Sequence, residues 1–455
     1  MVWAVLLNLI YVAEGSAARV FVLETEAGVT DVAARDVNAD GHNDIVALCS
    51  DEAREAPNRH VAVFLADPED FLPAKPTFTL DLDPAAGALF FAEVDGRPPA
   101  ELVVTADLGA QVYRFERGRF MESSRPRFKS LLPRALAAPV FLDIAEDLDG
   151  DGIDEWLVPV ASGYQVRTAT GVRAEIACGV SSGIKQTGGL SISHRLPAVH
   201  TFQRPGDPQR GLVFLNRKAA DFAYGEDFSE RTRYEFPSGS RKEWDVAAEM
   251  RDIDGDGLPD LVLTETRGAI GREVVAHVYL AAAPGVYPEA PLATFECQGA
   301  VASPLLEDVD GDKKLDLLLI RIPYNVKSFI SLFVLKKVTV HVDVYLFDGK
   351  GYAEKPDLRQ NITLAAPEER GQIEYTMGDF NGDGRLDAAF GTSGDKLVVH
   401  TGKKKKFLSQ RPWMEVAVPA TGTARVYELG GGRGQDLVIF HPGAEHNCRI
   451  EVVVF

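Results

Sequence analysis

The chain has 455 residues, of which 45% are hydrophobic and 25% charged, and this is the composition of a folded globular protein, not of a disordered one. Its formal net charge of −19 argues against nucleic acid or an anionic membrane surface as a partner. Beyond the N-terminal segment no apolar stretch approaches the ~18 residues that a transmembrane helix needs, so we expect a protein that does not span a membrane.

Residues 1–18 have the pattern of a secretory signal peptide. Residues 2–13 are apolar apart from Asn8, and the small residues at 15–18 are typical of a cleavage region. No Lys or Arg precedes Arg19, so a buried first strand is the alternative. We expect export, to the periplasm, the cell surface or the extracellular space, and a mature chain of residues 19–455.

An acidic motif repeats along that mature chain. The pattern D-x-[DN]-x-D, an acid at position nine and then a short apolar run, starts at Asp36, Asp147, Asp252, Asp308 and Asp379. Degenerate copies, which keep the turn and the apolar run but have lost most acids, start at Glu93, Gln203 and Glu428. Six of the seven intervals between starts are 49–57 residues, and the seventh is 71. This near-constant spacing predicts eight copies of one structural unit.

The segments between the copies have the pattern of strands. Val, Tyr and Phe alternate with polar residues at 60–67, 272–282 and 338–349, and no stretch keeps a 3.6-residue apolar period over twelve positions. About 55 residues suffice for four short antiparallel strands, which make one blade of a β-propeller. We therefore predict an all-β, single-domain propeller over 19–455. It has eight blades, or seven if one degenerate copy is not a blade.

The two ends of the mature chain both have the pattern of strands, at 19–25 and 449–455. We expect them to join in one blade and so close the propeller. The cysteines Cys49, Cys178, Cys297 and Cys448 are widely spaced without a CxxC motif, which argues against a zinc or redox site. Their even number permits disulfides, with Cys49 and Cys448 in adjacent blades as the candidate pair, but does not require them.

The acidic loops predict calcium sites, because Ca²⁺ takes six to eight oxygen ligands and carboxylates at alternate positions of a tight loop supply them. The five intact loops hold 19 of the 67 acidic residues. An EF-hand begins in the same way but needs a Glu at position twelve. That position is apolar in all five loops, as Ala47, Val158, Leu263, Leu319 and Phe390, so the loops are not EF-hands.

The loops resemble those of FG-GAP (VCBS-type) repeats, the family that builds the β-propeller of integrin α-chains and of many bacterial surface proteins. The resemblance covers residues 19–455. It implies that each loop joins two strands of a blade and that positions one, three, five and nine bind structural Ca²⁺, at up to five sites. The implied ligands are Asp36, Asn38, Asp40 and Asp44; Asp147, Asp149, Asp151 and Glu155; Asp252, Asp254, Asp256 and Asp260; Asp308, Asp310, Asp312 and Asp316; and Asp379, Asn381, Asp383 and Asp387.

Two loops depart from the family's pattern. Lys313 replaces the turn glycine, which adds a cation and requires a strained positive φ. Asp154 precedes Glu155, and the sequence leaves open which of the two faces the ion.

The function predicted from these features is that of an exported, calcium-binding propeller acting as a binding, adhesion or scaffold module for a protein or carbohydrate ligand. The alternatives are a polysaccharide-cleaving lyase, because some bacterial lyases resemble this architecture, and a structural subunit of an envelope complex. The chain has no GxSxG, HExxH or Walker-type motif. The long interval from Asp308 to Asp379 contains an apolar, aromatic and basic segment at 321–337, which is either a partner-contact surface or a hairpin packed on its own blade.

Overall fold

The computed structural model describes residues 18–455 except 52–57, 69–70, 107, 133–138, 187–189, 238–243, 269–271, 300, 324–330, 332–336, 366–374, 393–395, 420–421, 431–433 and 444–446. The predicted signal peptide and most of the 321–337 segment therefore lie outside the described residues. The chain divides into two compact units, which are Met1–Leu82 with Ala365–Lys403 and Leu408–Phe455, and Asp83–Leu364 with Lys404–Phe407.

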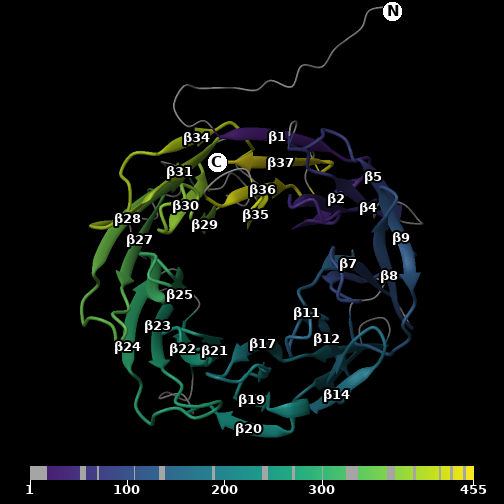
Figure 1. Ribbon diagram of the computed structural model, residues 1–455. Helices are drawn as coiled ribbons and strands as arrows, with labels where there is room; N and C mark the ends of the chain where they lie inside the picture. Colours follow the sequence, from purple (N-terminus) through teal and green to yellow (C-terminus); the bar gives the residue numbers. More distant parts are fainter. Residues whose placement is uncertain are drawn as a thin grey trace, which may run out of the picture. The chain divides into compact units, whose positions relative to one another are not determined.

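The first unit contains three four-stranded antiparallel sheets (Figure 1). One sheet consists of β2 (Gly28–Arg35), β3 (Asp44–Ser50), β4 (Arg59–Phe64) and β5 (Phe78–Asp81). The next consists of β29 (Tyr375–Gly378), β30 (Asp387–Gly391), β31 (Leu397–His400) and β34 (Met414–Val416), and the short strands β32 (Gly402–Lys403) and β33 (Lys406–Leu408) form a hairpin after β31. The third consists of β35 (Thr423–Tyr427), β36 (Asp436–Phe440), β37 (Arg449–Val454) and β1 (Arg19–Glu24).

The third sheet joins the two ends of the chain, as the sequence predicts. Strand β1 pairs with β37 in antiparallel register, with Arg19 opposite Val454 and Glu24 opposite Arg449. In Figure 1 the purple β1 lies beside the yellow β37. Leu23 is fully buried in the core that this sheet shares with the sheet of β2 to β5, so the pairing is supported by side-chain packing as well as by backbone hydrogen bonds.

Apart from a two-stranded hairpin, the described residues of the second unit form five sheets. Their strands are β6 (Ala88–Ala92), β7 (Glu101–Ala106), β8 (Gly109–Glu116) and β9 (Arg119–Ser124); β11 (Ala145–Glu146), β12 (Glu155–Val160), β13 (Gly163–Arg167) and β14 (Val172–Ala177); β17 (Ala198–Gln203), β18 (Arg210–Leu215), β19 (Ala219–Tyr224) and β20 (Glu230–Glu235); β21 (Asp245–Arg251), β22 (Asp260–Arg267), β23 (Arg272–Tyr279) and β24 (Ala293–Gly299); and β25 (Val301–Glu307), β26 (Asp316–Ile322), β27 (Lys337–Tyr345) and β28 (Leu358–Ala365).

Three further elements of the second unit were not predicted from the sequence. The short β10 (Val140–Phe141) adds to β6 in parallel. A hairpin of β15 (Ser181–Gln186) and β16 (Leu190–Arg195) follows β14, and a 3-10 turn at Glu226–Phe228 follows β19. Among the residues that the structure describes, no helix has the length and apolarity to cross a membrane.

The apolar cores lie between the faces of neighbouring sheets within each unit. Phe90 of β6 packs edge-on against Trp156 of β12 with ring centroids 5.3 Å apart, and both side chains are buried. In the three blades of the first unit the second strand, β3, β30 or β36, is buried along its whole length.

The fold is an all-β, eight-bladed β-propeller of four-stranded antiparallel blades, and each of the three degenerate sequence copies forms a blade. The prediction of eight blades is thus confirmed. The four cysteines are free thiols, so Cys49 and Cys448 are not bonded.

Candidate metal centres

Each acidic loop joins the first and second strands of its blade, and its position-one carboxylate organises the turn. In the loop that starts at Asp252, Oδ1 accepts a hydrogen bond from the N–H of Gly255 at 2.8 Å and Oδ2 accepts one from Gly257 at 2.9 Å. The position-six residue that donates the second bond has a positive φ, which is 87° at Gly257 and 68° at Lys313. Lys313 therefore carries the backbone strain that the sequence predicts, since only glycine adopts this conformation freely.

The position-five carboxylates fold back onto their own turn. Oδ1 of Asp256 accepts a hydrogen bond from the N–H of Leu258 at 2.8 Å, two residues further on. The same bond is made by the other position-five acids, Asp40, Asp151, Asp312 and Asp383. These acids lie outside the carboxylate clusters described next, although the family pattern implies them as ligands.

Carboxylates at positions one, three and nine gather into clusters whose ligand atoms lie within 4.8 Å of one another. In the intact loops the clusters are Asp147, Asp149 and Glu155; Asp252, Asp254 and Asp260; and Asp308, Asp310 and Asp316. In the loops that start at Asp36 and Asp379 the third position is an asparagine, and its Oδ1 accepts a hydrogen bond from Asp40 or Asp383. Each cluster could hold a metal ion; the metal ligation of the twenty residues itself stays a prediction.

The acid at position nine has a second role that the family pattern does not describe. Asp260 is almost fully buried, with 1% of its side chain exposed. Its Oδ2 accepts a hydrogen bond from the loop N–H of Ile253 at 2.8 Å, and its Oδ1 accepts one from Ala281, just beyond the third strand, at 2.7 Å. Asp44, Asp316 and Asp387 make the same two bonds. One carboxylate thus ties the loop to the far end of its own blade.

Two degenerate loops keep this acid, although the family pattern gives it no role there. Asp436 accepts hydrogen bonds from Leu429 at 3.1 Å and from Phe455 at 3.0 Å, and Glu101 accepts one from Val94 at 3.0 Å. Gly211 stands at this position in the loop that starts at Gln203. The signal was present in the sequence, because both copies keep an acid at position nine as well as at position one, where Glu93 and Glu428 stand.

Burial raises the pKa of these position-nine carboxyls. The pKa rises to about 7 for Asp260 and Asp316 and to about 6 for Asp44 and Asp387. The backbone hydrogen bonds lower the pKa of these groups, but the effect of burial is larger. Between pH ~4 and ~7 the folded chain therefore binds protons that the unfolded chain has released. In chelator we expect the stability that these groups contribute to be complete below pH ~4 and to be lost as pH rises through 6 to 7.

The corresponding measurement is a series of thermal melts in EDTA between pH 5 and pH 7.5. The melting temperature should fall as pH rises, by the equivalent of about 1 kcal/mol per group once solvent screening is allowed for. A melting temperature that rises over the same interval would contradict the protonation of these carboxyls in the metal-free protein.

The loop that starts at Asp147 shows which of the adjacent acids faces the cluster. Glu155 enters it, and its Oε2 accepts a hydrogen bond from Leu148 at 3.0 Å. Asp154 turns to the neighbouring blade, where its Oδ2 accepts a hydrogen bond from Glu93 N–H at 2.7 Å while its own N–H donates to the Glu93 carbonyl at 2.8 Å. Residues at position eight also link loops elsewhere, as Leu315 donates to Ile253 and Gln435 to Asp379.

A guanidinium already occupies this same cluster. Nη1 of Arg173 lies 2.5 Å from Asp149 Oδ2 and 3.0 Å from Glu155 Oε1. The cation supplies there the positive charge that a metal ion would supply in the other loops. Because Arg173 lies eighteen residues beyond Glu155, in the fourth strand, no local pattern in the sequence indicates this contact.

The degenerate loop that starts at Glu93 repeats the arrangement. Glu93, Asp95 and Glu101 form a carboxylate cluster that the sequence analysis did not predict. Arg114 pairs with Asp95, and its Nε lies 3.8 Å from Glu101 Oε1. Two neighbouring blades thus hold an arginine against their carboxylates.

In the loop that starts at Asp308, by contrast, one carboxylate oxygen lacks a partner in the part of the chain that the structure describes. Oδ1 of Asp310 is buried and has no hydrogen-bond partner among the described residues. At position three of the loops starting at Asp147 and Asp252 the corresponding oxygen accepts a backbone hydrogen bond. A buried carboxylate oxygen without a donor costs free energy, so this cluster lacks a positive group that would satisfy it.

No protein-family model matches the chain, and no curated protein matches it. Among solved structures, the V. cholerae biofilm matrix protein Bap1 is similar at 12% identity and a TM-score of 0.42, over 94% of this chain and 88% of that one. BBS1N in complex with ARL6DN is similar at 11% identity and a TM-score of 0.38, over 95% and 96%. Likeness at this level carries no argument about function, and the architecture rests on the strand pairing itself.

Proposed function

We propose that the chain is an exported propeller of the FG-GAP type whose acidic loops bind structural Ca²⁺, and that it acts as a binding or scaffold module at the cell surface or in the periplasm. The observation that carries the proposal is the convergence of carboxylates from positions one, three and nine in several blades. The unpartnered oxygen of Asp310 supports it, because a cation is the group that the cluster lacks.

The donor set suits calcium among the common metals. Every group in the clusters is a carboxylate, with an asparagine amide at position three of two loops, and hard oxygen donors select Ca²⁺ or Mg²⁺ over zinc or copper. Calcium adapts to irregular sites, whereas magnesium demands a near-ideal octahedron. Bound calcium would supply positive charge among acids that otherwise repel one another, which is a structural contribution. Affinities of ~10⁻⁴ to 10⁻³ M, typical of extracellular modules, fit the signal-like N-terminus.

The arginine contacts predict how many Ca²⁺ ions each chain binds. The loops that start at Asp36, Asp252, Asp308 and Asp379 have no arginine ion pair among the described contacts of their cluster residues, whereas Arg173 occupies the loop of Asp147. We therefore expect four bound Ca²⁺ per chain in equilibrium dialysis, and not the five that the intact motifs imply.

Arg173→Met should raise that stoichiometry to five. Without the guanidinium, Asp149 and Glu155 are left without a counter-ion, so in EDTA the variant should lose about 1–3 kcal/mol of stability and should regain most of it in calcium. Arg125→Met is the matched control, because Arg125 pairs with Glu122 on the surface away from the loops. Retention of four ions by Arg173→Met, with no rescue by calcium, would contradict the assignment.

A further inference from the structure

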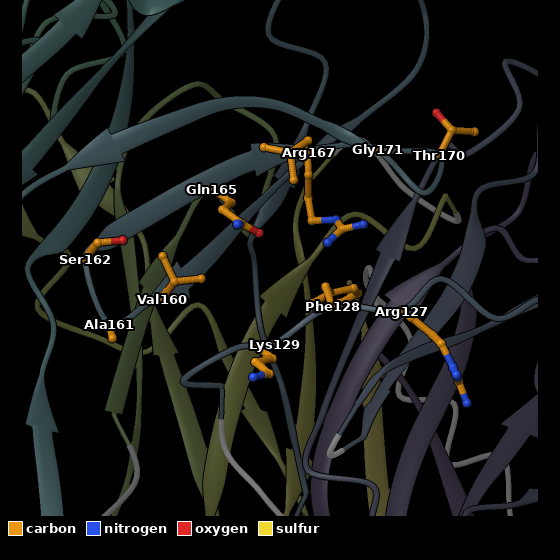
Figure 2. Close-up of a pocket in the computed structure, with 11 residues that line it drawn as sticks. Arg127, Phe128, Lys129, Val160, Ala161, Ser162, Gln165, Arg167, Thr170 and Gly171 are labelled. Carbon is orange, nitrogen blue, oxygen red and sulfur yellow. The ribbon is translucent and has the colours of Figure 1, made fainter.

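A groove in the second unit lies along strand β13, between that strand and the segment 127–129 that follows β9 (Figure 2). Its volume is about 610 Å³, within the range of small-molecule sites. Figure 2 shows Arg167 and Gln165 on the strand and Phe128 and Lys129 on the segment facing it. The groove contains no residue of the acidic loops.

The backbone holds the segment against the strands. Leu131 N–H donates to the carbonyl of Pro159 at 2.7 Å, and Ala110 N–H donates to that of Pro126 at 3.0 Å. Gly109 permits the second contact, because a Cβ at this position would lie 2.1 Å from the Pro126 oxygen. The groove is therefore bounded by residues with fixed backbone contacts on both sides.

Arg167 is the decisive residue, since it is a buried cation without a counter-ion. Only 4% of it is exposed. Its Nε donates to the Thr168 carbonyl at 3.3 Å, and its guanidinium carbon lies 4.1 Å from the centroid of the Phe128 ring. Among the described residues no carboxylate pairs with it, and burial lowers its pKa. Arg173, by contrast, contacts three carboxylates.

Other groove residues are cationic or polar as well. Arg127 and Lys129 are exposed cations, and no acidic residue lines the groove, although the chain as a whole carries a formal charge of −19. Ser162, Gln165 and Thr170 add hydroxyl and amide groups that can hydrogen-bond to a ligand. A cationic groove in an acidic protein attracts anions selectively.

We propose that this groove binds a small oxyanion, the carboxylate or sulfate of an acidic sugar, with the guanidinium of Arg167 as its buried partner. An oxyanion supplies the counter-charge that Arg167 lacks, and a planar guanidinium matches it by two parallel hydrogen bonds. The polar residues of the groove suit the hydroxyls of the sugar. The inference deepens the proposed function by giving the binding module a ligand class, but it does not depend on calcium in the loops.

The test is calorimetric titration of the full-length protein with sodium glucuronate, with glucose as the neutral match and with sodium sulfate, all at constant ionic strength in EDTA and again in calcium. Glucuronate should bind and glucose should not. Binding of glucuronate more tightly than sulfate assigns the ligand to acidic sugars, and equal binding assigns it to the oxyanion alone. Absence of binding by both anions would overturn the proposal, whereas a missing effect of calcium on stability would count only against the metal sites.

Substitutions at Arg167 and Lys129 show whether these residues bind the anion or only stabilise the fold. Arg167→Met should lower glucuronate affinity at least tenfold while the melting temperature without ligand stays equal or rises, because an uncompensated buried charge is removed. Lys129→Ala, at an exposed position, should weaken binding by a smaller factor without affecting folding. Lys218→Ala, an exposed cation outside the groove, is the matched control and should bind as the parent does. Unchanged affinity in both groove variants would overturn the proposal.

Discussion

Asp436→Ala is expected to lower the free energy of unfolding by about 2–5 kcal/mol, in EDTA and in calcium alike. Asp436 is fully buried and accepts hydrogen bonds from the N–H groups of Leu429 and Phe455. The alanine leaves the buried N–H of Leu429 and the part-buried N–H of Phe455 without this partner, at about 1–3 kcal/mol each. Phe455 directly follows strand β37, which pairs with β1, so the loss falls on the blade that joins the two ends of the chain.

Urea denaturation measures this effect, with Glu428→Ala as the matched control. Glu428 is an exposed acid at position one of the same loop, and its replacement should change stability by no more than about 0.5 kcal/mol. Because this loop has no acid at positions three and five, calcium should not alter the difference between the two variants. Equal stability of the two would show that the position-nine carboxylate does not tie the loop to its blade.

The effect of Asp310→Ala on the free energy of unfolding is expected to have opposite signs in EDTA and in calcium. In EDTA the substitution removes a buried oxygen without a donor and the repulsion of two neighbouring carboxylates, so the variant should be as stable as the parent or slightly more stable. In calcium it should lose the stabilisation from one site, about 2.7 kcal/mol when the free ion exceeds its Kd a hundredfold.

The control in the same blade is Asp348→Ala. Asp348 is exposed, and its Oδ1 accepts hydrogen bonds from Lys350 and Gly351 outside the acidic loop. Its replacement should change stability by the same amount in EDTA and in calcium. If Asp310→Ala also shows the same difference from the parent in both buffers, the loop that starts at Asp308 does not bind calcium.

The fold was predictable because the repeat sets the period of the structure. The eight copies correspond to eight blades, and the strand patterns at the two ends correspond to β1 and β37, which pair as expected. The hairpin of β15 and β16 was not predictable in this way, because it is inserted between blades and repeats nothing. Strand β10 is too short, at two residues, to produce a pattern.

The candidate sites were predictable only where their residues are close in sequence. The turn made by Asp252 and its neighbours is local, and the motif contains all of it. The contacts of Arg114 and Arg173 with carboxylates in the loops depend on strand register and side-chain reach across a blade, which the motif does not encode. The choice between Asp154 and Glu155 likewise depends on the neighbouring blade, where Glu93 binds Asp154.

The most direct test of the calcium sites is a thermal melt of the protein in excess EDTA, followed by titration with calcium from micromolar to ten millimolar. We predict a large rise in melting temperature that saturates near ~10⁻⁴ to 10⁻³ M free calcium, because the ion binds the folded loops and not the unfolded chain. A melting temperature that stays constant up to ten millimolar calcium would contradict the account and would leave the acidic loops as hydrogen-bonded turns without a metal.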